Sequence, residues 1–207
     1  MNTSKGRGSV KISNCNVYNT HKAMEASGYP MSVDAKVTHS NALRIAKKLG
    51  AMERGSGHDN FLHGVLVAFD LTCTNKMWVE FQRYHFAEIV SSQSTMHRVK
   101  GLLEQDVFND YVTEGMKKEV YRLLYEYNEE PNKENYLRLL YNIPSGIELT
   151  AHIVTNYGQL KTMYLQRCNH RLPEWREFCE YILTLPMFKE LTGINKESDE
   201  DEQQSQD

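Results

Sequence analysis

Apolar residues recur at helical spacing along several stretches of the chain, and these stretches predict helices. Within each stretch the apolar side chains stand three or four positions apart, so one side of the helix can face a core. Ser40 is the expected N-cap of the first helix, and Pro173 stands where a first helical turn accepts proline. The predicted helices cover residues 40–49, 75–86, 113–127, 132–141, 158–167 and 173–185.

Shorter segments that alternate between apolar and polar residues, or that form a short apolar run, predict strands between these helices. They cover residues 10–18, 65–71 and 147–154. Trp78 and Phe81 are expected in the core. Helices that outnumber a few interleaved strands indicate an α+β fold, in which the helices pack on a small central sheet.

The length of the chain, 207 residues, suits one domain with a proper core, and we expect that domain to cover residues 1–195. The remaining segment, residues 196–207, is acidic and has no apolar residue, so the sequence predicts a disordered tail. The net charge of -3 and the isoelectric point near 6.2 provide no overall basic field. Direct nucleic-acid binding is therefore not expected.

No apolar run approaches the roughly 18 residues of a membrane span, and the N-terminus lacks the apolar core of a secretory signal. The four cysteines, Cys15, Cys73, Cys168 and Cys179, are scattered and form no CxxC pair. Nothing in their local sequences marks an activated thiolate. The pattern favours reduced thiols over a disulfide framework or a zinc site, so we expect a cytoplasmic protein without membrane association.

Candidate chemistry concentrates in residues 57–98, where histidines and arginines surround apolar segments. Aromatic rings beside cationic donors suit a planar ligand that carries phosphate, because arginine offers a rigid donor fork to phosphate oxygens. A core helix that ends in a polar turn is the alternative interpretation. The pairs His58 with His63 and His85 with His97 lack the spacing of metal ligands on one helix face, so no metal site is predicted.

Two blocks of polar and charged residues follow one another in an informative order. The first block holds Gly-His-Asp at residues 57–59 and Arg-Tyr-His at residues 83–85. The second block, after a long helical segment, holds Pro144, Asn156 and Arg167. In this order and spacing the chain resembles the flavin-dependent thymidylate synthases, the ThyX family, over most of its predicted folded part.

The chain departs from the family pattern at several positions, most of them cationic. Asp59 replaces the glutamate of Gly-His-Glu, and only the first residue of the Arg-His-Arg triplet is kept, as Arg83. The Ser-x-Arg motif becomes Ser-Thr-Met at residues 94–96, if one residue is inserted before it. The arginine that precedes the Leu-Pro block is Leu140, and the arginine of Asn-x-Arg is Gly158.

The resemblance implies an FAD-dependent enzyme that transfers a one-carbon unit from methylenetetrahydrofolate to C5 of dUMP, with NADPH as the reductant. It also implies a homotetramer whose active sites lie between subunits. Arg167 matches the family arginine that favours loss of the N3 proton of the pyrimidine, so it is the expected catalytic residue. The alternative is a surface arginine at a helix end, near the C-terminal dipole.

Further site residues match the family motifs or stand close to its missing arginines. The residues expected to bind the cofactor are His58, Asn60, Arg83, Tyr84, His85 and Asn156. The residues expected to bind the nucleotide are Gln93, Ser94, Arg98, Arg138 and Arg176. Two alternatives to the enzyme stay open: a non-catalytic ThyX-fold protein for nucleotide binding or assembly, and a relative that modifies another pyrimidine nucleotide.

Overall fold

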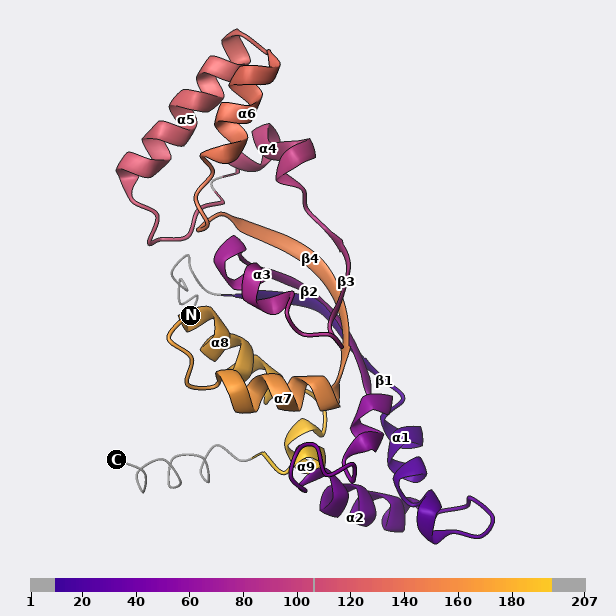
Figure 1. Cartoon of the computed structure of the whole chain (residues 1–207). Coiled ribbons are helices and arrows are strands. Elements are labelled where there is room, and N and C mark those ends of the chain that lie inside the picture. The colour runs from indigo at the N-terminus through magenta and orange to yellow at the C-terminus, as the bar shows by residue number, and fades with distance from the viewer. Residues whose placement is uncertain (1–9, 106, 195–207) are drawn as a thin grey trace, which may run out of the picture.

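The computed structural model describes residues 10–105 and 107–194, in which strands and helices alternate along the chain (Figure 1). Helices are arranged around a small sheet, which confirms the predicted α+β fold. The tail predicted for residues 196–207 lies outside the described residues, and the domain boundary at residue 195 stays a prediction. Within the described ranges, no helix is long and apolar enough to cross a membrane.

The sheet contains β1 (Lys11–Tyr18), β2 (Leu66–Thr74), β3 (Glu88–Ser92) and β4 (Glu148–Asn156). Its strand order is β1-β2-β4-β3, and every neighbouring pair is antiparallel. β2 and β4 form the centre, while β1 and β3 are the edges. In β3 the register shifts by one residue between Ile89 and Ser91, which leaves Val90 as an extra, bulged residue.

Helices lie against one face of the sheet and at both of its ends (Figure 1). The face is covered by α3 (Asn75–Phe81), α7 (Tyr157–Arg167) and α8 (Pro173–Ile182). One end holds α1 (Thr20–Ser27), α2 (His39–Gly50), α9 (Phe188–Thr192) and the short 3-10 helices η1 (Tyr29–Met31) and η2 (Asn60–Gly64). The opposite, helical end holds α4 (Thr95–Leu103), α5 (Glu114–Glu129) and α6 (Lys133–Tyr141).

The alternation of side chains along β2 explains why only one face is covered. Val67, Phe69 and Leu71 are buried, and the ring of Phe69 lies 6.0 Å from that of Phe178 in α8. On the other face, Asp70 pairs with His152 of β4 at 2.7 Å. None of the helices among the described residues lies over that second face (Figure 1).

The helical end has a hydrophobic cluster of its own. In that cluster Leu103 of α4 and Val120 of α5 pack with Leu139 of α6. Leu149 of β4 touches both this cluster and the main core, so β4 links the two.

Most predicted elements are confirmed within a few residues of their expected ends. Thr113 and Asn132 cap α5 and α6 by accepting hydrogen bonds from the backbone at 3.3 Å and 2.8 Å. Ser40 is not the N-cap of α2, because that helix begins at His39 and Thr38 precedes it. Trp78 and Phe81 are in the core, as expected.

The helix predicted over residues 75–86 is too long, since α3 ends at Phe81. The N–H of Tyr84 bonds to the carbonyl of Phe81 in a turn that leads toward β3. Tyr84 remains half-buried, so the helical spacing of aromatic residues continues beyond the helix. The sequence analysis also missed α1, β3, α4 and α9.

α2 and α9 approach so closely that Gly50 has no room for a side chain. A Cβ at Gly50 would lie 1.7 Å from the carbonyl oxygen of Leu191. We expect Gly50→Ala to lower the free energy of unfolding by about 1–3 kcal/mol, as measured by urea denaturation. Gly115→Ala in α5 is the matched control, because nothing lies within 4 Å of its Cβ. That control should be neutral or stabilising by up to about 1 kcal/mol; equal losses would contradict the packing argument.

Candidate functional site

The passage from β4 into α7 organises one side of the candidate site. Asn156 ends β4 and caps α7, because its Oδ1 accepts the backbone N–H of Gln159 at 2.9 Å. Its side chain also hydrogen-bonds to His63. Asn156 is buried. In the structure, the side chain of this expected cofactor residue therefore stabilises the first turn of α7.

Asp59 lies at the centre of a buried ionic network. It is 0% exposed, and its two carboxylate oxygens lie 3.0 Å and 3.2 Å from Nη1 of Arg54. Nζ of Lys161, on α7, lies 3.6 Å from Asp59 and donates to the carbonyls of Gly50 and Met52. Burial lowers the pKa of Lys161, and Asp59 opposes that shift. The network fastens the loop between α2 and η2 to α7.

His63 of η2 extends this network toward the sheet. Nη2 of Arg54 lies 3.1 Å from Nε2 of His63, and this nitrogen must accept because a guanidinium has no acceptor. Burial lowers the pKa of His63, and the charge of Arg54 lowers it further. The ring of His63 lies 5.7 Å from that of Phe86, so η2 meets the turn before β3.

The turn between α3 and β3 carries Arg83, Tyr84 and His85. The hydroxyl of Thr155 donates to the carbonyl of Phe86 at 2.8 Å and so fixes the turn against β4. Arg83 and His85 are exposed. Neither side chain is hydrogen-bonded or ion-paired to another described residue, which leaves their donors for a ligand.

His58 and Asn60 are exposed on either side of the buried Asp59, at the start of η2. The expected cofactor residues therefore come from η2, from the α3–β3 turn and from the β4–α7 junction. Because Phe86 contacts both His63 and Thr155, these separate segments meet on one side of the molecule.

Arg167, the expected catalytic residue, ends α7 and is held from several sides. Its Nε donates to the hydroxyl of Tyr84 at 2.9 Å, and its Nη1 lies 3.6 Å from Oε2 of Glu80. The guanidinium carbon lies 5.1 Å from the ring centroid of Trp175, a cation–π distance. Its side chain is 20% exposed, which differs from a solvated arginine at a helix end.

Glu80 of α3 connects the members of this cluster. Its Oε2 accepts the indole N–H of Trp175 at 3.0 Å and lies 3.4 Å from Nε2 of His170. Each of these contacts joins residues far apart in the sequence, so no local pattern marks them. The polar residues of the site that sequence reasoning missed are Arg54, Glu80, Lys161 and His170.

Gln93 and Ser94, expected to bind the nucleotide, lie at the other end of β3. Oε1 of Gln93 accepts a backbone N–H of β4 at 2.9 Å, and Ser94 caps α4. The strand between them and the Arg83 turn has 5 residues, or about 15 Å. The bulge at Val90 places one extra residue in β3, ahead of Ser94.

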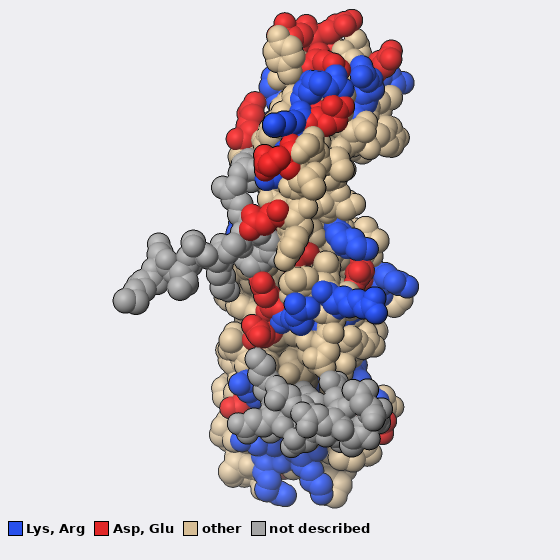
Figure 2. Space-filling model, turned by 90° about the vertical axis from the view of Figure 1, so that its left-hand side faces the viewer, with Lys and Arg blue, Asp and Glu red and all other residues tan. Residues whose placement is uncertain are grey.

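The remaining expected nucleotide residues are distributed over three helices. Arg98 is exposed on α4. Arg138 of α6 lies 3.4 Å from Glu126 of α5, in a helical end where both signs of charge intermix (Figure 2). Arg176 of α8 donates to two carbonyls of the loop before that helix, at 2.6 Å and 3.2 Å. Of the expected cofactor residues, Tyr84 contacts Arg167 directly, whereas Asn156 stands at the opposite end of α7. Most of the residues expected to bind the nucleotide lie on other elements.

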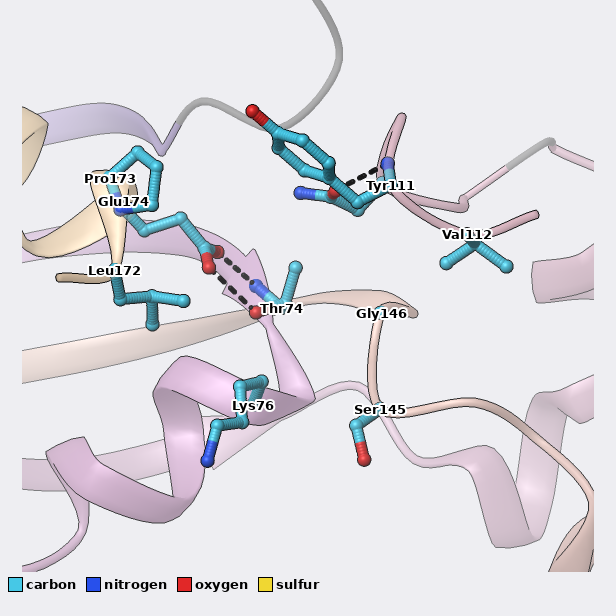
Figure 3. Close-up of a pocket in the computed structure, with 10 residues that line it drawn as sticks. Thr74, Lys76, Tyr111, Val112, Ser145, Gly146, Leu172, Pro173 and Glu174 are labelled. Atoms are coloured by element: carbon cyan, nitrogen blue, oxygen red, sulfur yellow. Dashed lines mark hydrogen bonds between the residues drawn. The ribbon is translucent and has the colours of Figure 1, made fainter.

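A separate cavity of ≈ 340 Å³ opens between the starts of α3 and α8 (Figure 3). Glu174 points toward Thr74, whose backbone N–H and hydroxyl donate to its carboxylate at 2.7 Å and 2.8 Å. Burial raises the pKa of Glu174. None of the expected site residues lines this cavity, and no group of three or more His, Cys, Asp or Glu in the described ranges could hold a metal.

The fold is that of the flavin-dependent thymidylate synthases, as comparison with solved structures shows. The chain is similar to thymidylate synthase X from Helicobacter pylori with FAD and dUMP, with a TM-score of 0.67 and 15% identity over 89% of this chain and 96% of that one. A second structure of that enzyme with FAD and dUMP gives a TM-score of 0.63 and 14% identity, over 89% and 97%. No family model and no curated protein matches the sequence. The predicted ThyX-like fold is thereby confirmed.

His63 gives the site a pH dependence of stability. Because its pKa in the fold is below the ordinary value of 6.5, the unfolded chain binds more protons in the window below about 6.5. The free energy of unfolding should therefore fall as the pH decreases through that window. His63→Gln should flatten this slope in urea denaturation between about pH 5 and pH 8. His58→Gln, at an exposed position, is the control and should keep the wild-type slope; two equally flattened slopes would contradict the assignment.

Proposed function

We propose that the chain is an FAD-dependent thymidylate synthase-like enzyme, which transfers a one-carbon unit from methylenetetrahydrofolate to C5 of dUMP. NADPH is the proposed reductant. The observation that carries the proposal is the fold, which matches ThyX structures with FAD and dUMP over 89% of the chain. The meeting of the expected cofactor residues on one side of the molecule supports it.

The expected cofactor residues fit FAD in their chemistry. Arg83 presents a rigid fork of N–H donors, which suits a pyrophosphate or the carbonyl edge of a flavin. His58, Asn60 and His85 are exposed nearby, and none of these side chains is committed to another described residue. When bound, reduced FAD supplies the hydride for the reaction. The protein supplies position, since Asn156 and the Asp59 network hold the surrounding segments.

Arg167 would act on the pyrimidine by charge. A cation beside the ring stabilises the negative charge that develops when N3 loses its proton, and this charge polarises the C5–C6 bond. Tyr84, Glu80 and Trp175 already hold the guanidinium in one orientation, so little reorganisation is needed during the reaction. The carboxylate of Glu80 offsets part of the positive charge of Arg167. The stabilisation of the pyrimidine anion therefore depends more on how the guanidinium is oriented toward the ring.

We further propose that the active protein is a homotetramer. Within one chain, β3 separates the residues expected at the nucleotide from those at the cofactor by about 15 Å. A mononucleotide is shorter than this distance. A second copy that contributes its Gln93, Ser94 or Arg98 would complete the site, and the uncovered sheet face offers a surface for such contacts.

A non-catalytic ThyX-fold protein that binds nucleotides or serves in assembly is the second candidate, and the missing cations favour it. Met96, Leu140 and Gly158 stand where the family pattern has arginine. Arg138, close to Leu140 in the sequence, is paired with Glu126. A relative that modifies another pyrimidine nucleotide would share the flavin residues and differ in product, which product analysis resolves.

Binding of FAD is the first test. The purified protein should take up FAD at micromolar concentration, followed by the change in flavin fluorescence. Arg83→Ala should weaken binding about 10-fold or more, because hydrogen bonds to charged groups contribute about 1.5–3 kcal/mol. Arg44→Ala, at an exposed position of α2, is the matched control and should bind as the wild type does. A wild-type protein that takes up no FAD would refute flavin chemistry.

Arg167→Lys tests the catalytic role. An ammonium cannot reproduce the planar fork that Tyr84 and Glu80 hold, so turnover should fall by about 10²–10³-fold while FAD stays bound. Tritium release from C5-labelled dUMP measures turnover, with flavin occupancy recorded in parallel. Arg171→Lys, at an exposed position, is the control. Near-normal turnover in Arg167→Lys would contradict the catalytic role of Arg167. A wild-type protein that binds FAD but shows no turnover would favour the non-catalytic candidate.

A further inference from the structure

The cavity between the starts of α3 and α8 lies between the two hydrophobic clusters of the chain. Leu172 of its lining packs against the main core, and Val112 packs against the cluster of the helical end. Its volume of ≈ 340 Å³ is at the small end of the range of small-molecule sites, which is about 300–1,000 Å³. We call it the Glu174 cavity; its lining includes Lys76, Tyr111, Val112, Leu172, Pro173 and Glu174.

Glu174 is the only carboxylate among the lining residues, and it lacks a counter-charge. It is 4% exposed and forms no ion pair with a described residue. Burial raises the pKa of Glu174, and the negative charges of Glu148 and Glu177 raise it further. Lys11 lies 3.7 Å from Glu148, not in an ion pair with Glu174. Because a buried charge without a partner is costly, a cation in the cavity would stabilise this carboxylate.

Thr74 holds the carboxylate of Glu174 in one direction without neutralising it. The hydroxyl oxygen of Thr74 accepts the backbone N–H of Met77 at 3.3 Å, so its single hydrogen is donated to Glu174. The backbone N–H of Thr74 reaches the other carboxylate oxygen. A carboxylate has about four acceptor positions, and these two bonds occupy only part of them. The carboxylate is therefore oriented and can still accept a hydrogen bond from a ligand.

Lys76 is the one cation among the lining residues, and it is directed elsewhere. Its Nζ lies 3.9 Å from Oε1 of Glu80, one turn further along α3. In Figure 3 its amine points away from Glu174. Its side chain is 62% exposed, so water and salt screen its charge. Lys76 therefore does not serve as the counter-ion of Glu174.

Tyr111 offers an uncovered aromatic ring to the same cavity. In Figure 3, Tyr111 and Val112 lie across from the start of α8, which carries Glu174. Tyr111 is 84% exposed, although its backbone N–H is fixed by Oδ1 of Asn109 at 2.9 Å. The face of an aromatic ring attracts cations. The side chains of Val112 and Leu172 add apolar surface that suits the hydrocarbon part of a ligand.

We propose that the Glu174 cavity binds a small organic ammonium ion, with Glu174 as its counter-ion and Tyr111 beside the cationic group. The apolar walls favour an organic cation over a metal ion, and no group of three metal-ligating side chains is found in the described ranges. None of the residues expected to bind flavin or nucleotide lines this cavity. The proposal therefore stands apart from the proposed enzymatic activity, and binding is measurable without turnover.

NMR titration of the isotope-labelled full chain tests the proposal with benzylamine, benzyl alcohol and benzoate. These probes share a ring and differ in charge, since near pH 7 they are a cation, a neutral molecule and an anion. Benzylamine should bind about 10-fold or more tightly than benzyl alcohol, because a hydrogen bond to a charged group is the stronger one. Benzoate should bind most weakly. The backbone amide signals of Tyr111, Val112 and Gly146 should shift on binding.

Glu174→Gln removes the charge and keeps the shape of the side chain. Its amide oxygen can accept the N–H of Thr74, and the hydroxyl of Thr74 can turn to accept from the amide nitrogen. The variant should lose the preference for benzylamine over benzyl alcohol. Glu129→Gln removes the same charge from an exposed position of α5 outside the cavity and should keep the preference. Melting temperatures establish that both variants are folded.

Tyr111 provides a second test that leaves the buried carboxylate intact. Tyr111→Leu should weaken benzylamine binding by about 2- to 5-fold, whereas Tyr111→Phe should bind as the wild type does, because phenylalanine keeps the aromatic face. Both variants should fold normally, since the position is exposed.

The proposal is overturned if the wild-type protein binds benzylamine and benzyl alcohol equally, or binds neither. It is also overturned if the shifted amides lie away from the cavity, or if Glu174→Gln and Glu129→Gln reduce the preference equally. Should Glu174→Gln fail to fold, the comparison of probes on the wild type and the Tyr111 variants decides the outcome.

Discussion

The candidate site depends on the direct passage of β4 into α7. β4 is a central strand, paired with β2 on one side and β3 on the other, so its end is fixed by the sheet. Asn156 closes the junction by capping α7 at the first turn. α7 then runs under the sheet with most of its residues buried, and its position determines where Lys161 and Arg167 can meet their partners.

Both cations of α7 are held by carboxylates from other segments. Lys161 meets Asp59 of the loop before η2, and Arg167 meets Glu80 of α3. Removal of one partner from a buried pair leaves an uncompensated charge, which costs several times more than an exposed pair contributes. These pairs therefore fix the loop and the helix around α7 more strictly than apolar packing alone would. The site is assembled by the same contacts that fold this part of the chain.

The sequence predicted the elements whose signal is local. α5 and α6 have amphipathic spacing and capping residues, Thr113 and Asn132, within a few positions of one another. β3 was not predicted, because it is an edge strand whose residues are mostly exposed, so its sequence shows no alternation of apolar and polar residues. α4 was not predicted, because a kink at Arg98 and a glycine at position 101 interrupt the helical spacing of its apolar residues.

The candidate site was predictable only in part, for a related reason. Arg83, His85 and Asn156 could be found by their order along the chain, which a family resemblance supplies. Glu80 could not, because its partners Trp175 and His170 stand about ninety residues away and no spacing rule connects them. The predicted helix through Tyr84 was too long, because the spacing of aromatic residues continues past the end of α3 at Phe81. The turn that follows α3 carries Tyr84, which packs on Arg167.

The glycine at position 158, where the ThyX pattern has arginine, has a physical explanation within this chain. A Cβ at Gly158 would lie 3.1 Å from two ring atoms of His63, so an arginine there would require His63 to move. His63 is itself held by Arg54, which reaches the same place from the loop after α2 and also neutralises Asp59. A guanidinium is therefore present beside the β4–α7 junction, although it comes from another segment. Because Arg54 is committed to Asp59, His63 and Thr162, it stabilises the junction. Arg83, in contrast, forms no hydrogen bond or ion pair with another described residue and can reach a ligand.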